Sequence, residues 1–495
     1  MGAACPNVEL RDFTEGEEAP MSTMPDAIEI AKTELDELAN CLRKAVGKVV
    51  ASDATFADRE VAALAVTNEV VRKMLEAELQ QLSDGFGEQV RVDDVPYAEH
   101  LDGKVGYHSL CGRLWVRRST YREVGVRNGP TIVPLALAAG LVERMTPALA
   151  QSVAVGYAKD DMRSHEENLR LARRVPPSRT AMEQAAKRVS RMAQRHQPRI
   201  EADVRRAEVL PDGAHAIHVG LDRTSVPMEE PAPRPAKPPR RRHNKPYVRK
   251  APEPVTVNYR MAYIGTVSIV DQHGDALVTR KYAAPAADDP ARIVARMVAD
   301  VRRALQQNPS LSVGIVQDGA PEMWNLMRAG LNAEPTVTEY FEGIDRYHLV
   351  EHLAKALELV ERDDAERKKI LDGWRNDFEY RDSAIDSVEH LLQKRAGWIT
   401  GANAEKLAEE LVYLRNNKDR MRYVTLRNQG LPVGSGTTEG AGKSVINKRC
   451  KGSGQRWHDD GLRAALSLRS WYCSDRFPLA WSHLSRHYTA EVVID

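Results

Sequence analysis

The chain is poor in the residue types that define several protein classes. Its five cysteines, at positions 5, 41, 111, 450 and 473, include no Cys-x-x-Cys pair. Such a scattered set argues against a disulfide framework and a cysteine-based zinc site, and it favours reduced thiols in a cytoplasm. Aromatic residues make up 6% of the chain, so aliphatic side chains must fill its cores.

Long hydrophobic runs are also absent. No apolar stretch approaches the roughly 20 residues that a helix needs to cross a bilayer. The first 20 residues are acidic, whereas a secretory signal is basic and then apolar. These two absences predict a soluble, cytoplasmic chain without a membrane partner.

Net charge is nearly absent too, at +1, but its distribution is uneven. Residues 1–100 contain 9 Lys/Arg and 21 Asp/Glu, and the rest of the chain carries the compensating positive excess. The acidic first 100 residues and the basic remainder suggest that the remainder binds a polyanionic partner, although ordinary surface solvation explains the same pattern. A length of 495 residues predicts two or three domains.

The first two segments are predicted to be mainly helical. Residues 1–104 are interpreted as an acidic tail followed by helices. Residues 105–210 are interpreted as a DNA-binding region, with a short hairpin over 107–126 and then several helices. Three of those helices are predicted at 135–145, from Pro147 to about 162, and after a capping Ser164.

A basic helix from about residue 180 follows a Pro-containing turn that ends in Ser178. It carries Lys187, Arg188 and Arg191, which become candidate DNA contacts. This arrangement resembles a helix-turn-helix, but on form alone a plain helical bundle with a solvated basic face is the better interpretation.

From residue 211 strands alternate with helices, which predicts an α/β layered domain. Strands are expected at 216–222, 255–270, 276–282, 311–316 and 340–347, with helices at 289–307 and from Pro321. A basic arm over 231–250 interrupts this pattern. It holds six Pro and eight Lys/Arg and no acid, so Arg240, Arg241 and Arg242 are candidate phosphate contacts.

The remaining chain divides into two predicted segments. Residues 349–430 are helical and highly charged and read as an inserted helical domain. Residues 431–495 begin with a Gly-rich loop, continue with a helix from Thr437, and end with a helix over 459–472.

Three acids occupy positions suited to metal chemistry. Asp222 and Asp318 each follow an apolar strand, and Glu439 begins a helix after a Gly-rich loop. Carboxylates that converge would repel one another unless a cation lies between them, and their oxygens suit Mg²⁺ or Mn²⁺. An Asp-Gly after a strand commonly makes a plain turn, so the three acids together carry the prediction.

The residues after Glu439 favour contact with phosphate. Lys443 and Asn447 follow at four-residue steps, which predicts one shared helix face. No acid occurs between residues 441 and 457, and glycines there allow backbone amides to approach a phosphate. A solvated basic helix is the alternative. The predicted phosphate contacts are Lys443, Lys448, Arg449, Lys451 and Arg456.

Three sequence blocks resemble the DDE transposases of bacterial insertion sequences. They are VGLDRTSVPM from residue 219, IVQDGAPEMW from residue 315, and LPVGSGTTEGAGKSVINKRCKGSGQRW from residue 431. The last block is similar to the group typified by the Kra insertion sequence. The resemblance spans roughly residues 105–480. Where that group often carries a Cys-x-x-Cys pair, this chain has Cys111 alone.

The resemblance implies an RNase H-like mixed sheet core, an all-α insertion domain and a preceding, mainly helical DNA-binding region. It implies catalysis by Asp222, Asp318 and Glu439 with Mg²⁺ or Mn²⁺, two ions being expected. Asp345 and His348 resemble an accessory element of several transposase groups, or they simply begin a helix.

The implied activity is binding of terminal inverted repeats, DNA cleavage and strand transfer. The implied partner is double-stranded DNA, at the element ends and the target, bound by a homo-oligomer in a bacterial cytoplasm at the nucleoid. Two alternatives stay open, namely a non-catalytic DNA-binding protein derived from a transposase and another RNase H-like nuclease.

Overall fold

The structure is a computed structural model that describes residues 32–231 and 255–494. The chain divides into two compact units, residues 1–63 and 64–495, which are described separately. The first contains helix α1 (Lys32–Val49) and the beginning of α2 (Phe56–Asp84). Thr55 starts α2 by a reciprocal cap, because its hydroxyl accepts from the Asp58 N–H while its own N–H donates to the Asp58 carboxylate.

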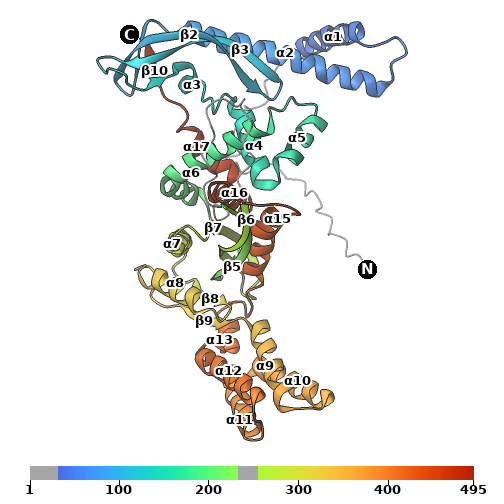
Figure 1. Cartoon of the computed structure of the whole chain (residues 1–495), viewed down its shortest axis with the longest axis vertical. Coiled ribbons are helices and arrows are strands. Elements are labelled where there is room, and N and C mark those ends of the chain that lie inside the picture. The colour runs from blue at the N-terminus through green and yellow to red at the C-terminus, as the bar shows by residue number, and fades with distance from the viewer. Residues whose placement is uncertain (1–31, 232–254, 495) are drawn as a thin grey trace, which may run out of the picture. The chain divides into compact units, whose positions relative to one another are not determined.

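In the second unit, an antiparallel sheet has the order β10-β1-β2-β3-β4 (Figure 1). Its strands are β1 (Gln89–Val92), β2 (Val95–Ser109), β3 (Gly112–Glu123), β4 (Thr131–Ile132) and β10 (Val492–Ile494). The predicted hairpin over 107–126 is the β2–β3 pair, which begins twelve residues earlier than expected. The predicted boundary at residue 104 therefore falls inside β2, and the C-terminal β10 pairs with β1 in this sheet.

Four helices follow this sheet in the chain and two more lie near its C-terminal end; the first of them packs on β3 and β10, and the other five pack together. They are α3 (Pro134–Ala138), α4 (Pro147–Lys159), α5 (Met162–Leu171), α6 (Arg179–Ala207), α16 (Asp459–Tyr472) and α17 (Phe477–Ser485). Ser178 caps α6 by accepting a hydrogen bond from the Ala181 N–H. The apolar face of α6 packs against α4, α16 and α17 around Met182, Val189 and Ala193. On that face α6 is part of a helical bundle.

Two sequence predictions about these six helices are wrong. The helix expected over 135–145 ends at Ala138, because Gly140, Glu143 and Arg144 adopt positive φ angles that no α-helix allows. Helix α5 is capped by Asp161 and not by Ser164, since the Asp161 carboxylate accepts from the backbone N–H groups of Arg163 and Ser164.

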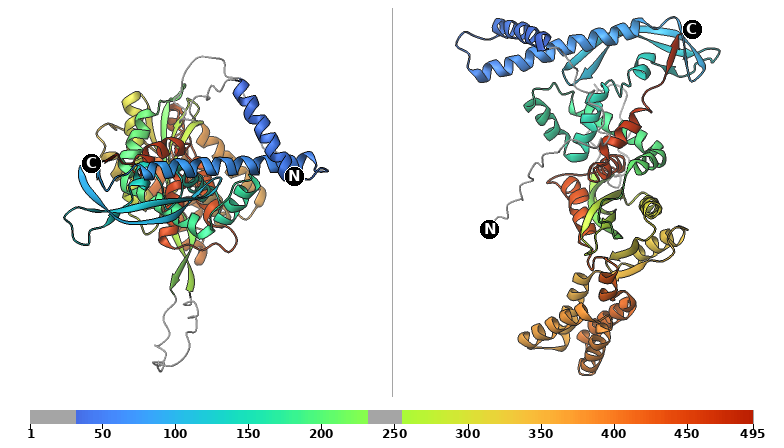
Figure 2. Two further views of the ribbon diagram at one scale, coloured as in Figure 1. Left: turned by 90° about the horizontal axis from the view of Figure 1, so that it is seen from above. Right: turned by 180° about the vertical axis from the view of Figure 1, so that it is seen from behind.

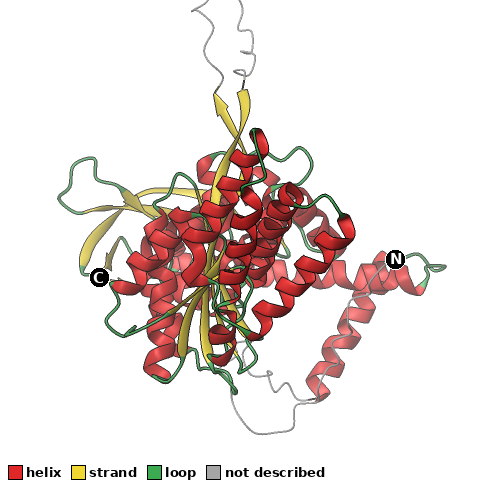
Figure 3. Ribbon diagram, turned by 90° about the horizontal axis from the view of Figure 1, so that it is seen from below, coloured by secondary structure: helices red, strands yellow, loops and turns green. Residues whose placement is uncertain are grey.

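A second sheet has the order β7-β6-β5-β8-β9. Strands β5 (Ala216–Pro231), β6 (Val255–Val270) and β7 (Ala276–Pro285) pair antiparallel, whereas β8 (Ser312–Gln317) and β9 (Phe341–Ile344) run parallel to β5. The structure thus contains a mixed α/β domain, as expected. Beyond the helices, β5 and β6 continue as a two-stranded ribbon as far as Pro231 and Val255 (Figure 3). Residues 232–254 lie outside the described residues, and they include the predicted arm after Pro231 with Arg240, Arg241 and Arg242.

Helices cover both faces of this sheet. On one face lie α7 (Pro290–Gln307) and α8 (Pro321–Asn332), and on the other lie α14 (Gly436–Ala441), a π-helix (Gly442–Asn447), α15 (Lys448–Cys450) and α16 (Figure 2). Neighbouring residues of β6 point to opposite faces of the sheet. A Cβ on Gly265 would meet Ile293 and Met297 of α7, whereas Thr266 hydrogen-bonds Thr438 of α14 at 2.7 Å.

Strand β5 differs from its prediction in one respect that concerns the site. The strand was expected to end at Asp222, but it continues to Pro231. The reason is that β6 pairs with β5 along its whole length, while the parallel partner β8 pairs only with Ala216–Val219. Asp222 therefore lies inside a strand, at the level where the parallel half of the sheet stops.

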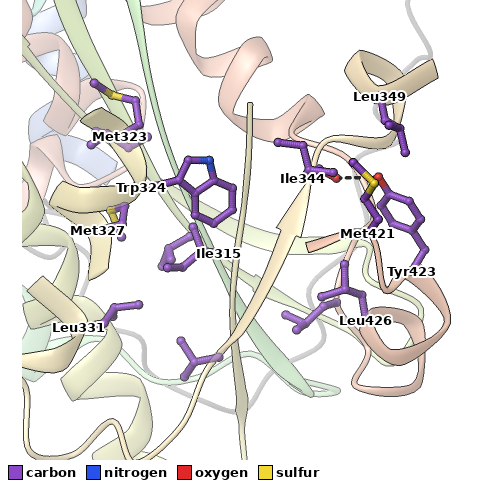
Figure 4. Close-up of a cluster of buried hydrophobic side chains, with 14 of the residues drawn as sticks. Ile315, Met323, Trp324, Met327, Leu331, Ile344, Leu349, Met421, Tyr423 and Leu426 are labelled. Atoms are coloured by element: carbon purple, nitrogen blue, oxygen red, sulfur yellow. Dashed lines mark hydrogen bonds between the residues drawn. The ribbon is translucent and has the colours of Figure 1, made fainter. Parts of the chain in front are cut away.

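The charged segment after β9 is helical, as predicted. It comprises α9 (Arg346–Val360), α10 (Asp364–Tyr380), α11 (Ala384–Ala396), α12 (Ala402–Asn417), a 3₁₀ turn (Lys418–Arg420) and α13 (Tyr423–Asn428). Its core is continuous with that of the sheet, because Met421, Tyr423 and Leu426 pack next to Ile344 of β9 (Figure 4). The Tyr423 hydroxyl donates to the Ile344 carbonyl at 3.1 Å. None of the helices in the described ranges is long and apolar enough to span a membrane.

Candidate active site

The three predicted acids reach one region from different elements. Along β5, alternate residues face α14: the His218 ring lies 3.2 Å from the Thr437 hydroxyl, and Asp222 lies on the same face four residues later. Gly220, between them, permits this approach, because a Cβ there would lie 2.2 Å from the Thr438 hydroxyl oxygen. A helix can therefore bring Glu439 close to Asp222.

Asp318 approaches the same region from the neighbouring parallel strand. The last residue pair between β5 and β8 is Val219 with Ile315, and Asp318 directly follows the end of β8 at Gln317. The charge of Asp318 raises the pKa of Asp222, so the two carboxylates lie near each other. The Gln317 side chain holds the two strands together here by accepting from the Leu221 N–H at 3.2 Å. The Asp318 loop is itself fixed, since Asp318 accepts from the Ala320 N–H and its carbonyl accepts from the Trp324 indole.

The electrostatics of Asp222 reflect this convergence. Burial raises the pKa of its carboxyl above the usual range, and the charges of Asp318 and Glu439 raise it further. The Arg223 N–H, 2.6 Å from the carboxylate, and His348 offset this only in part. A half-buried carboxylate facing two others is thus left without sufficient positive charge from the chain.

The predicted accessory pair joins the site next to Glu439. Asp345 caps α9 by accepting from the N–H groups of Tyr347 and His348, and it also accepts from the Ser435 N–H just before α14. Burial raises the pKa of Asp345, but these hydrogen bonds outweigh it and the net pKa is lowered. Asp345 therefore stays ionised while joining the start of α9 to the loop that carries Glu439.

His348 faces both acids. Its Nδ1 lies 3.2 Å from Asp345 Oδ1 and 4.0 Å from Glu439 Oε1, yet it makes no well-formed hydrogen bond among the described residues. One ligand atom from each of Asp345, His348 and Glu439 lies within 4.8 Å of the others. A cation could be held here as well, next to the three predicted acids.

Basic and polar residues border the acids. Lys443 Nζ lies 4.0 Å from Glu439, and Lys451 donates to the Thr224 hydroxyl at 2.8 Å, two residues beyond Asp222. Asn447 also lies near Thr224, at 3.4 Å. Regular four-residue spacing was expected from Glu439 to Asn447, but residues 442–447 form a π-helix, so this face is shifted. π-Helical turns are frequent at functional sites.

The other predicted phosphate contacts divide into two groups. Lys448 and Arg456 are exposed, as a phosphate contact must be. Arg449 is not, because it is 4% exposed, stacks on the Tyr157 and Trp457 rings and donates to the Tyr157 carbonyl. Its position in the basic run suggested a surface role, but the helix turns this residue into the core.

The three predicted contacts on α6 lie on its partly exposed side. Lys187 forms an ion pair with Asp460 at 3.2 Å, and Arg188 lies 3.7 Å from Glu143. Arg191 is exposed. None of the three lies near the acids of the site, so any DNA contact they make is separate from it.

Tyr413 is a site residue that the sequence analysis missed. It belongs to α12, and a Cβ on Gly319 would lie 2.7 Å from its ring. The ring stacks on His352, which is held by Glu410 at 2.6 Å. Burial and the charges of Asp318 and Asp345 raise the pKa of its buried hydroxyl. Ninety-five residues separate Tyr413 from Asp318, and no local pattern links the two positions.

Comparisons with known proteins add nothing to this description. No protein-family model matches the chain, and no curated protein matches it.

Proposed function

We propose that the chain is a DDE-type transposase with an RNase H-like core, which binds the terminal inverted repeats of its element and catalyses metal-dependent DNA cleavage and strand transfer. The observation that carries the proposal is that Asp222 of β5 lies close enough to Asp318, which directly follows the adjacent parallel strand β8, and to Glu439 of α14 for both charges to raise its pKa. The sheet order, three antiparallel strands followed by two parallel ones, supports it.

The donor set fits Mg²⁺ or Mn²⁺. Asp222, Asp318 and Glu439 offer carboxylate oxygens, which these hard cations prefer, and the raised pKa of Asp222 indicates that further positive charge would be stabilising there. A bound divalent cation, or two, supplies charge that stabilises the attacking and leaving oxygens of an in-line displacement at phosphorus. A covalent intermediate with the protein is then unnecessary.

Residues of the chain itself would position the DNA. Lys443, 75% exposed, is placed to meet a phosphate next to Glu439, and Lys451 can do so next to Asp222. His348 can hold or transfer a proton at Nδ1, which faces Glu439. Asp345 keeps that imidazole and the Glu439 loop in place.

The experiment is cleavage of a linear duplex that carries the DNA flanking the coding region of this chain. Cleaved and joined products are expected with Mg²⁺ or Mn²⁺ and not with Ca²⁺, whose loose geometry aligns the attack poorly. Equal activity in EDTA would contradict the proposal. Cleavage without joining would favour another RNase H-like nuclease, and binding without cleavage would favour a non-catalytic DNA-binding protein.

A further inference from the structure

The helical segment after β9 contacts the loop that carries Asp318. Tyr413 of α12 lies against Gly319, because a Cβ added to this glycine would lie 2.7 Å from a ring carbon of Tyr413 and 3.5 Å from its hydroxyl oxygen. Arg420, in the 3₁₀ turn after α12, places its guanidinium carbon 4.2 Å from the centre of the Trp324 ring, and the Trp324 indole donates to the Asp318 carbonyl. Two side chains of the helical segment therefore help to place this loop.

The ring of Tyr413 is held in one orientation. It stacks on the His352 ring, with 3.7 Å between the ring centres and 18° between the planes. His352 is held in turn by Glu410, whose carboxylate lies 2.6 Å from Nδ1. The Asn417 side chain donates to the Tyr413 carbonyl at 3.0 Å. A side chain fixed in this way loses little rotamer freedom when its hydroxyl gains a partner.

The Tyr413 hydroxyl is buried next to two carboxylates. The charges of Asp318 and Asp345 both raise its pKa, which places both acids near it. Among the described residues its oxygen has no hydrogen-bond partner, and a buried hydroxyl that lacks one is destabilising. Asp345 already accepts from three backbone N–H groups, whereas the Asp318 carboxylate accepts from one in the described part of the chain. Asp318 is therefore the acid with acceptor capacity left for this hydroxyl.

We infer that Tyr413 is a positioning residue for Asp318. When a divalent cation binds, the Tyr413 hydroxyl donates a hydrogen bond to one oxygen of the Asp318 carboxylate and thereby fixes the oxygen that faces the cation. The inference rests on the proposed function, because it concerns the same cation site. A hydrogen bond to a ligating carboxylate orients it, and loss of such a bond typically weakens metal binding by about 10–100-fold. Helix α12 thus contributes to the cation site through Asp318.

The first test measures Mn²⁺ binding by the full chain without DNA, with free Mn²⁺ followed by electron paramagnetic resonance. Asp318→Asn defines the site, because the Mn²⁺ that this variant fails to bind is the Mn²⁺ held at Asp318. Tyr413→Phe removes only the hydroxyl and should raise the Kd of that Mn²⁺ by about tenfold or more. Tyr380→Phe is the matched control, since Tyr380 on α10 is 73% exposed, and it should bind Mn²⁺ as wild type does. Equal melting temperatures of both Phe variants and wild type in EDTA show that all three fold alike.

The outcomes separate this inference from the proposed function. If Tyr413→Phe keeps the wild-type Kd while Asp318→Asn loses the Mn²⁺, the inference is overturned and the proposed cation site stands. If wild type binds no more Mn²⁺ than Asp318→Asn does, the inference and the cation site fail together. Wild-type Mn²⁺ binding by Tyr413→Phe with weaker DNA binding in EDTA would also overturn the inference, because it would assign the hydroxyl to a DNA phosphate.

The second test uses the stack on His352. His352→Ala removes the ring that orients Tyr413 and should weaken Mn²⁺ binding less than Tyr413→Phe does, whereas His352→Phe keeps a ring there and should restore most of the affinity. Combining His352→Ala with Tyr413→Phe should add little, because both act through the same hydroxyl. Fully additive losses would mean that the two residues act separately, and they would overturn the inference. The Mn²⁺ concentration for half-maximal cleavage should rise in parallel with the Kd, whereas a merely structural defect lowers the rate at every Mn²⁺ concentration alike.

Discussion

Asp300 and Asp222 are acids of the same domain in opposite electrostatic situations. Asp300, on α7, is 7% exposed, and burial alone would raise its pKa, yet Arg476 and Arg205 lower it. Arg205 Nε donates to Asp300 at 2.6 Å, Arg476 donates at 3.1 Å, and Tyr282 adds a third donor. Asp222 faces Asp318 and Glu439, and its pKa is raised.

A second buried acid follows the pattern of Asp300. Glu201, on α6, is 2% exposed and is paired with Arg296 at 2.6 Å and Arg205 at 3.0 Å, so its pKa is lowered despite burial. The chain thus supplies arginine side chains to both of these buried acids. It gives Asp222 no such partner, since its pKa stays raised. This difference is the physical reason to expect a cation from solution near Asp222.

The largest expected effect is on catalysis at Glu439. Glu439→Gln keeps the size of the side chain and removes the charge that a cation needs, so cleavage should fall by roughly a thousandfold or more. Asp222→Asn and Asp318→Asn should behave alike, and combining two should add little. Binding of end DNA and the melting temperature should be unchanged or slightly higher. Cleavage at the wild-type rate would remove Glu439 from the site.

Breaking the ion pairs around Asp300 should reduce the stability of the fold, whereas changing Glu439 should reduce cleavage. Arg476→Met removes one of two cations from buried Asp300, which keeps Arg205, and one of two from Glu208, which keeps Arg280, and this should cost about 3 kcal/mol of unfolding free energy. Asp222→Asn should cost none. Chemical denaturation of both variants checks this contrast, with the exposed Arg486→Met as a control. Similar losses for Arg476→Met and Asp222→Asn would show that the two groups of acids do not differ as proposed.

His218, on the same strand as Asp222, is a second buried titratable group, and it should make the stability of the fold depend on pH. Burial lowers its pKa to about 4, and the hydrogen bond to the Val316 carbonyl and the charge of Asp345 offset this only in part. Between pH 6.5 and 4 the unfolded chain binds a proton that the folded chain does not, so stability should fall as the pH falls. The loss should be about 3 kcal/mol over this window. Denaturation midpoints at pH 7 and pH 4.5 measure it, and His218→Gln should lose less between them.

The smallest expected effect concerns the arm. Replacing residues 232–254 by an Asn-Gly turn is compatible with the ladder, because Pro231 and Val255 pair directly. If the arm contacts phosphates, affinity should fall alike for all DNA sequences and its salt dependence should flatten. A variant that keeps the arm but has the Lys and Arg residues of the arm changed to Gln should show the same loss of affinity and the same flattened salt dependence. An unchanged salt slope would mean that the arm makes no phosphate contact.

Much of the second sheet could be predicted locally. Apolar spacing, together with Asp or Pro at helix starts, predicts strands β6 and β8, helices α7 and α16, and the first turn of α8 at Pro321. The errors in the strands share one cause, which is that distant pairing overrides local pattern. Strand β5 extends past Asp222 because β6 continues beside it, and β10 exists because β1 offers an edge.

The candidate site likewise contains residues that the sequence identified and residues that only the fold revealed. Asp222, Asp318 and Glu439 could be named from the sequence, because carboxylates at strand ends and helix starts form a recognisable pattern. Asp345 and His348 were named only through the resemblance to transposases. Arg449 could not be assigned, since burial depends on which side of a three-residue helix faces Tyr157 and Trp457. Tyr413 could not be found, because only folding brings α12 against Gly319.

The sequence by itself therefore determined the element types over most of this chain and the chemical identity of the acids. Both depend on residues within a few positions of each other. Only the tertiary structure decided which acids meet and which charges are compensated. Parallel pairing of β5 with β8 brings the residue after β8, Asp318, near Asp222, and the missing side chain of Gly220 admits α14. The energies of these charges depend on distance and burial in space, which separation along the chain does not specify.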